Sequence, residues 1–252
     1  RRIPRAGVKA NADTLDEVGV LARSVDDVAL LAHLLCGRAG VALPGAQGFT
    51  PRIGVTLTSR PSLLSSDMLA MVATSARRLS AAGPQVRDVA AWPAGFDALF
   101  EAQRTVQLFE TARALAPELQ YRRAALSPTL AAFLDEGSRI EPATYAAALA
   151  CGRAASAVIE VLFADADALI TSAAPGAAPR DLSTTGDPLF NRPWQLLDCP
   201  CVTVPGGVNS AGMPLSLQVV GRPGDDERVF AAAAWIGQAL RSDAIAQGHA
   251  LV

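Results

Sequence analysis

Few residues in this 252-residue chain combine the type and the spacing that covalent catalysis needs. The one pair of adjacent serines is Ser65-Ser66, and the one lysine is Lys9. A serine hydroxyl is a poor nucleophile near pH 7 unless a base takes its proton. Lysine can be that base only where burial lowers its pKa from about 10.4. Ser65-Ser66 has no flanking glycines and precedes a helical pattern, so the pair is predicted to cap a helix. No catalytic residue is assigned.

The histidines and cysteines do not form a recognisable metal site. His33 is expected to be a core residue near the apolar face of a helix, whereas His249 lies in the polar tail. Two distant histidines need carboxylate or thiolate help to hold zinc. Cys199 and Cys201 are interpreted as buried strand cysteines, one on each face of the strand. We therefore predict neither a metal nor an organic cofactor.

A long loop over residues 172–192 is rich in proline and glycine, and loops of this length are often functional. Aromatic and polar side chains converge where it ends, at Asp187, Phe190, Asn191 and Trp194. These four residues are candidates for a substrate pocket, and plain packing is the alternative. Gly206-Gly207 and the segment 221–224 are predicted to be turns, since neither has the strand and helix context of a dinucleotide-binding loop.

Predicted strands and helices, which must position these residues, alternate along the chain. Strands are predicted at residues 52–58, 85–89, 167–171, 201–205 and 215–221. Helices are predicted over 24–36, 65–82 and 225–240, and within 95–164, with breaks near Pro117, Pro128 and Pro142. The strand–helix–strand order is typical of parallel α/β units. We predict one α/β domain over residues 1–252, with a twisted mixed sheet covered by helices on both faces.

The composition narrows the classes of partner. Half of the residues are apolar and 18% are charged, below the roughly 25% of soluble domains, which indicates much buried surface or a face that expects a partner. A net charge of −2 gives no attraction to nucleic acid or anionic membranes. No membrane span is expected, because the alanine-rich stretch 143–164 carries Arg153 and Glu160. Four cysteines are too few for a disulfide scaffold, so a cytoplasmic location is expected.

Three groups of short motifs occur in order. The first comprises residues 2–9 (RIPRAGVK), 14–19 (TLDEVG) and 22–27 (ARSVDD). The second is 167–171 (DALIT), followed by Pro175 and Ala178-Pro179. The third comprises 186–191 (GDPLFN), Pro193-Trp194, Cys199-Pro200, 204–206 (VPG) and 213–221 (MPLSLQVVG).

Together these motifs resemble the amidase-signature family of hydrolases, over residues 2–240. The first group is similar to the family's G-R-x-P stretch with its S-L-D-x-x-G and A-R-S-V-x-D motifs. The second is similar to its D-x-L-L-x-P-x-x-P-x-x-A-P strand and loop, and the third to its closing strands. No single motif is decisive, but their shared order makes a chance match implausible.

The resemblance implies acyl transfer from a carboxamide to water by a Ser–cisSer–Lys set, without a cofactor. In the family that set lies upstream of the G-R-x-P segment, where this sequence begins. The chain is therefore expected to be a C-terminal part that is inactive alone. Once completed, it would act on a small-molecule amide. The resemblance also implies that Asp187, Phe190, Asn191 and Trp194 border the acyl pocket.

Two competing hypotheses stay open. The chain can be a non-catalytic remnant that binds a partner, or a different hydrolase whose nucleophile is not recognised. In either the family or the remnant interpretation, the sheet is expected to be incomplete. An uncovered apolar face would then favour self-association, so a homodimer is included among the expected partners.

Overall fold

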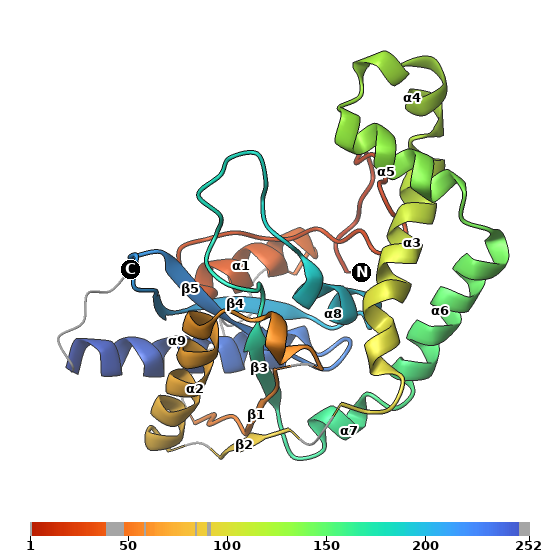
Figure 1. Cartoon of the computed structure of the whole chain (residues 1–252). Coiled ribbons are helices and arrows are strands. Elements are labelled where there is room, and N and C mark those ends of the chain that lie inside the picture. The colour runs from red at the N-terminus through yellow and green to blue at the C-terminus, as the bar shows by residue number, and fades with distance from the viewer. Residues whose placement is uncertain (1, 39–47, 58, 84, 90–91, 247–252) are drawn as a thin grey trace.

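The computed structural model describes residues 2–38, 48–57, 59–83, 85–89 and 92–246 (Figure 1). Within them, five strands form one sheet in the order β2-β1-β3-β5-β4. Their bounds are β1 (Ile53–Val55), β2 (Val86–Asp88), β3 (Ala168–Ser172), β4 (Cys201–Val208) and β5 (Pro214–Val220). Strand β1 is parallel to β2 and β3, whereas β5 is antiparallel to β3 and β4. The predicted mixed sheet is confirmed.

The helices begin where the sequence supplies caps and prolines. The α-helices are α1 (Val25–Leu35), α2 (Ser66–Ala81), α3 (Leu99–Ala114), α4 (Ala116–Tyr121), α5 (Pro128–Ser138), α6 (Pro142–Ser156), α7 (Glu160–Phe163), α8 (Arg192–Leu196) and α9 (Asp226–Ala246). The described residues also form the 3₁₀ turns η1 (Pro61–Leu63), η2 (Phe96–Ala98), η3 (Arg123–Ala125) and η4 (Leu189–Asn191). Ser24, Ser65 and Ser127 each accept a backbone N–H from the first turn of the following helix.

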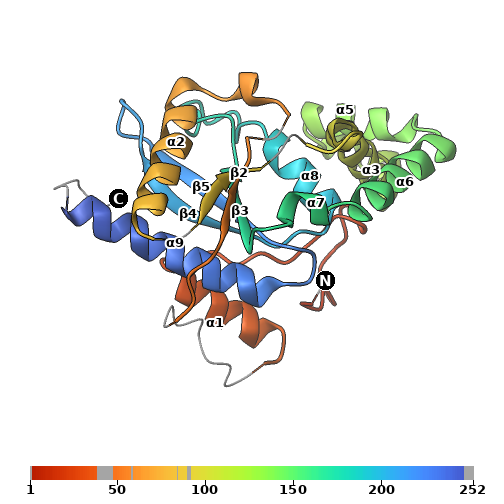
Figure 2. The same cartoon turned by 90° about the horizontal axis from the view of Figure 1, so that it is seen from below.

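Alternate residues of the strands bury two separate cores. Ile170, Leu217 and Val219 face a cluster that includes residues of α2 and α9. Leu169 and Val220 face the opposite cluster, which includes α7 and Trp194 of α8. Helices therefore cover both faces, as predicted, and α3, α5 and α6 form a further layer to one side of the sheet (Figures 1 and 2).

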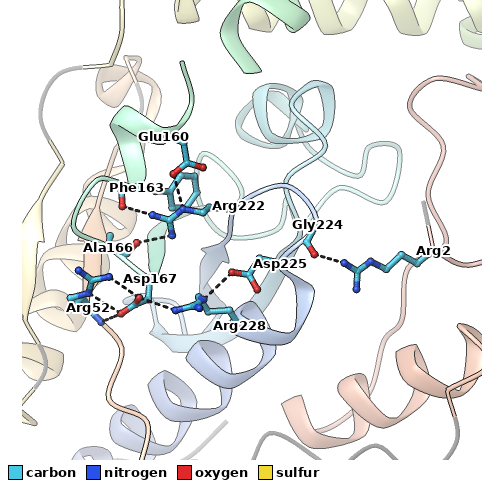
Figure 3. Close-up of polar contacts among 10 residues, drawn as sticks. All are labelled: Arg2, Arg52, Glu160, Phe163, Ala166, Asp167, Arg222, Gly224, Asp225 and Arg228. Atoms are coloured by element: carbon cyan, nitrogen blue, oxygen red, sulfur yellow. Dashed lines mark hydrogen bonds and ion pairs between the residues drawn. The ribbon is translucent and has the colours of Figure 1, made fainter. Parts of the chain in front are cut away.

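An ion-pair network ties the starts of two parallel strands to the start of the last helix (Figure 3). The Asp167 carboxylate accepts hydrogen bonds from the backbone N–H of Arg52 at 2.8 Å and from its guanidinium at 3.0 and 3.1 Å. Arg228 of α9 donates a further bond at 3.2 Å. These donors, with the Arg52 guanidinium contributing most, lower the pKa of Asp167 to about 2. Nearby in space, Arg222 donates to the backbone carbonyl of Phe163, the last residue of α7, and to that of Ala166 just beyond it (Figure 3).

Two sequence-based expectations need correction. Gly206-Gly207 is not a turn: β4 continues through Val208, and the register shifts between Pro205 and Gly207 as in a β-bulge, with the hairpin turn lying beyond it. By length and composition alone, the stretch Pro142–Phe163 is apolar enough to cross a membrane, as the core helices of many proteins are. In the structure this stretch is divided into α6 and α7, and α6 packs on α3.

The leucines of α1 face outward, whereas its valines and alanines pack on the core. Ala29 and His33 are its buried residues, while Leu30, Leu31, Leu34 and Leu35 are 40–53% exposed. Strand β4 is also at an edge, because the described residues supply no strand on its far side. Edge strands and exposed leucines are each surfaces that another polypeptide can cover.

Candidate functional site

The serine pair and the lysine do not meet. Ser65 accepts the N–H of Met68 at 3.2 Å as the cap of α2, and its own N–H donates to Pro175. Lys9 is bound in an ion pair to Glu118 of α4, and this contact lowers the pKa of the Glu118 carboxyl. Figure 1 shows α2 and α4 at opposite ends of the molecule. The described residues therefore do not assemble a serine–lysine pair from these candidates.

A cavity of about 640 Å³ opens beside the β4 edge of the sheet. Residues of α1, α3, α8 and the start of α9 form its walls, together with segments 17–20 and 198–202. This volume lies within the range of small-molecule sites. Most charged groups around it are paired, for example Arg2 with Asp226 and Arg38 with Glu227, both at 3.3 Å.

Two of the four predicted pocket residues line this cavity. Asn191 and Trp194 are in its wall, on successive turns of η4 and α8. Phe190 is fully buried in the core cluster of α2 and α9. Asp187 is exposed, and its carboxylate accepts the N–H of Leu189 at 2.9 Å and lies 3.8 Å from Arg192. The structure thus places Asn191 and Trp194 in the cavity wall, Phe190 in the core and Asp187 on the surface.

Carboxamide side chains that sequence analysis did not select complete the wall. Gln218 of β5 donates to the Asn191 carbonyl at 2.8 Å, and Asn191 donates to the backbone carbonyl of Ala173 at 2.9 Å. Gln103 of α3 donates to the Gln195 carbonyl at 2.8 Å. Isolated glutamines resemble ordinary surface residues in a sequence. The one available signal was Gln218, an amide inside a mostly apolar strand.

His33 is a buried core residue, as predicted, and is 4% exposed. Its Nε2 lies 2.9 Å from both carboxylate oxygens of Glu227 in α9, and its ring meets Phe230 edge-on. Its Nδ1 is buried without a partner among the described residues. No group of three His, Cys, Asp or Glu side chains is close enough to hold a metal in the part of the chain that the structure describes.

The interpretation of the two nearby cysteines is wrong. Residues i and i+2 of a strand point to the same side, and both Cys199 and Cys201 line the cavity. Neither is a buried core residue: Cys199 is half-buried and Cys201 opens onto the cavity. Desolvation by the surrounding protein raises the pKa of the half-buried Cys199 well above its usual value and also raises that of Cys201. Both are therefore thiols at neutral pH, which are poor nucleophiles and poor metal ligands.

Comparison with known proteins gives consistent relatives. The model of the family described as Amidase matches residues 1–230. The chain is 27% identical to a component of the glutamyl-tRNA(Gln) amidotransferase of Granulibacter bethesdensis, covering 98% of this chain and 60% of that protein. A solved amidase crystal structure is similar with a TM-score of 0.83 and 25% identity, covering 94% of this chain and 56% of that one.

A second structure of similar shape belongs to a vestigial protein complex that bears on the origins of an s-triazine catabolic enzyme. It has a TM-score of 0.80 and 22% identity, and the match covers 96% of this chain and 56% of that one. The chain thus spans 56–60% of the length of these relatives.

Proposed function

The chain belongs to the amidase family, and from this premise we propose that it forms the substrate-binding C-terminal part of a hydrolase that cleaves non-peptide carboxamides. The observation that carries the proposal is the cavity beside β4, whose wall contains Asn191, Trp194 and Gln218 from the third motif group. The carboxamides of this wall suit a polar ligand, because each can donate and accept hydrogen bonds. Charged residues of the lining, such as Arg2 and Arg38, form ion pairs with Asp226 and Glu227.

The four predicted residues take different parts in this proposal. Asn191 and Trp194 contact the substrate. Phe190 anchors their segment in the core, and Asp187 orients the segment through its contacts with Leu189 and Arg192. No metal or organic cofactor is part of the proposed reaction.

Hydrolysis also needs an activated nucleophile, a base and donors for the oxyanion in one place. Ser65 caps a helix, and Lys9 forms an ion pair with a distant helix. We therefore propose that the part of the family fold outside these 252 residues supplies the catalytic groups. The 252-residue chain alone is expected to be inactive.

The test compares two proteins from the same gene. The 252-residue chain and the product of the longest reading frame that contains it are purified and assayed against aliphatic and aryl amides. Hydrolysis by the longer product alone is the expected result. Turnover by the 252 residues that disappears with Ser65→Ala or Lys9→Ala would overturn the proposal. A longer product that carries a serine–lysine set and hydrolyses no amide would also overturn it.

A second candidate function is a non-catalytic role in a complex. The exposed leucines of α1 and the uncovered β4 edge favour it, as does the likeness to one component of an amidotransferase. The partner in that case is another polypeptide, including a second copy of this chain, rather than nucleic acid or a membrane. Four unpaired cysteines support a cytoplasmic location for either function. A stable complex without amide turnover in the longer product would favour this candidate.

A further inference from the structure

Three of the four cysteines of the chain gather around the cavity beside β4. Cys36 caps the end of α1, and it lines the cavity together with Cys199 and Cys201 at the start of β4. The fourth cysteine, Cys151, lies in α6, which packs on α3. All four are free thiols. A small thiol-reactive compound that enters the cavity therefore meets sulfur atoms from two separate segments of the chain.

Cys199 and Cys201 form the closer pair. Residues i and i+2 of an extended chain point to the same side, with Cα atoms about 6.6 Å apart. The Cys201 thiol donates to the backbone carbonyl of Cys199 at 3.5 Å, so its sulfur reaches back towards its neighbour. The Cys199 thiol lies 4.0 Å from the carbonyl of Leu197. Thiols are weak donors, so side-chain rotation can bring the two sulfur atoms together at little cost.

The surroundings limit what this pair can bind. No group of three His, Cys, Asp or Glu side chains is close enough to hold a metal among the described residues. A structural zinc ion needs four ligands, with its cysteines as thiolates. Burial raises the pKa of both Cys199 and Cys201, so both carry their protons at pH 7. A suitable ligand must therefore accept only two sulfur atoms and must carry away the thiol protons itself.

We propose that Cys199 and Cys201 form a dithiol site for a trivalent organoarsenical. In water such a compound is R–As(OH)₂, with two exchangeable hydroxyl groups and one carbon substituent that stays in place. Each As–O bond is replaced by an As–S bond, and each thiol proton leaves with a hydroxyl group as water. Arsenic stays trivalent, so the step needs no oxidant or reductant. The half-buried side chains of Val18, Val20 and Val28 line the same cavity and offer apolar surface to the substituent.

The affinity of the site depends on having two thiols. Once one As–S bond has formed, the second forms within the same molecule at a high effective concentration. Loss of either thiol should therefore weaken binding at least about a hundredfold. Arsenite carries three exchangeable hydroxyl groups and no carbon substituent. The pair replaces only two of them and leaves no group to fill the cavity, so arsenite should bind more weakly than an arylarsenical.

The experiment uses phenylarsine oxide and the reduced 252-residue chain at pH 7, after the reductant is removed. The intact mass should rise by one phenylarsenic group with the loss of two hydrogen atoms, and the number of free thiols should fall from four to two. The remaining thiols are alkylated in urea and the chain is cut with trypsin. Cys199 and Cys201 share the tryptic fragment 181–228, because Arg192 and Arg222 precede prolines, whereas Cys36 and Cys151 fall on other fragments. Only fragment 181–228 should escape alkylation.

Variants assign the two ligands. Cys199→Ser and Cys201→Ser should each weaken binding of phenylarsine oxide at least about a hundredfold. Cys36→Ser and Cys151→Ser are the matched controls and should change it less than about twofold. Dithiothreitol should release the phenylarsenic group, whereas glutathione at the same thiol concentration should not. An unchanged melting temperature shows that a variant is folded. Where a serine variant does not fold, the alkylation pattern of the unaltered chain decides the question.

Four results would overturn the proposal. They are no increase in mass, alkylation of fragment 181–228 after treatment, loss of binding in Cys36→Ser, and arsenite that consumes three thiols and binds more tightly than phenylarsine oxide. The last two would place Cys36 in the site. The outcome is independent of the proposed function, because binding needs neither a substrate nor the catalytic groups. A longer gene product that hydrolyses no amide would leave the dithiol site intact.

Discussion

The substitution Asp167→Asn is expected to destabilise the fold by about 2–3 kcal/mol at pH 7. The side chain of Asp167 is 9% exposed and accepts four hydrogen bonds from Arg52 and Arg228. Asparagine places an NH₂ group among these donors and removes the charge that they stabilise. The loss lies at the low end for buried pairs, because both arginine side chains are 46% exposed and water can solvate them.

The pKa gives the same magnitude by a separate route. Lowering the pKa of Asp167 from 3.8 to about 2 corresponds to about 2 kcal/mol of stabilisation from its ionised form. Because the folded pKa is depressed, this contribution is fully present well above pH 4. It is lost as the pH falls from about 4 towards 2. The difference between the two proteins should therefore shrink steadily in this range.

Urea unfolding at pH values between 3 and 7 measures this difference directly. Asp165→Asn is the matched control, since Asp165 lies two residues away in an ion pair with Arg87 but is 69% exposed. Its effect should stay within about 0–1 kcal/mol. An Asp167→Asn protein as stable as the original at pH 7, or a difference that does not shrink on acidification, would refute the assignment of Asp167 as the link between β1, β3 and α9.

Three further outcomes follow from particular contacts. Gly137→Ala should lower the free energy of unfolding by at least about 2 kcal/mol, measured by thermal or urea unfolding, because the added Cβ would lie 2.1 Å from the backbone carbonyl oxygen of Leu108. Gly237→Ala in α9 is the control and should be neutral or stabilising, since its added Cβ would make only ordinary van der Waals contacts. Ser65→Ala should lower stability by about 1 kcal/mol as the loss of a helix cap, and an unchanged stability would count against that role. The double substitution Leu31→Glu and Leu34→Glu should reduce self-association, measured by light scattering, and the binding of a hydrophobic dye, measured by fluorescence. The melting temperature should not fall, because both leucines are exposed, and a lower melting temperature would show that they pack.

The elements could be predicted because their signals are local. Ser24, Ser65 and Ser127 mark helix starts through a bond that each makes to its own first turn, and the apolar run in 167–171 indicates a buried strand. Strand order could be expected only as a mixed sheet, because the pairing of β3 with β5 rather than with β4 depends on contacts far apart in sequence. The extension of β4 through a bulge was missed, since two adjacent glycines look like a turn.

The candidate site was predictable only in part, for a physical reason. Phe190 and Trp194 are one helical turn apart, but the 3₁₀ turn at 189–191 precedes α8, and the two rings enter different cores. Gln103 and Gln195 come from α3 and α8, which meet only when the helical layer packs beside the sheet. A glutamine gives no sign in the sequence of which face of its helix will be buried.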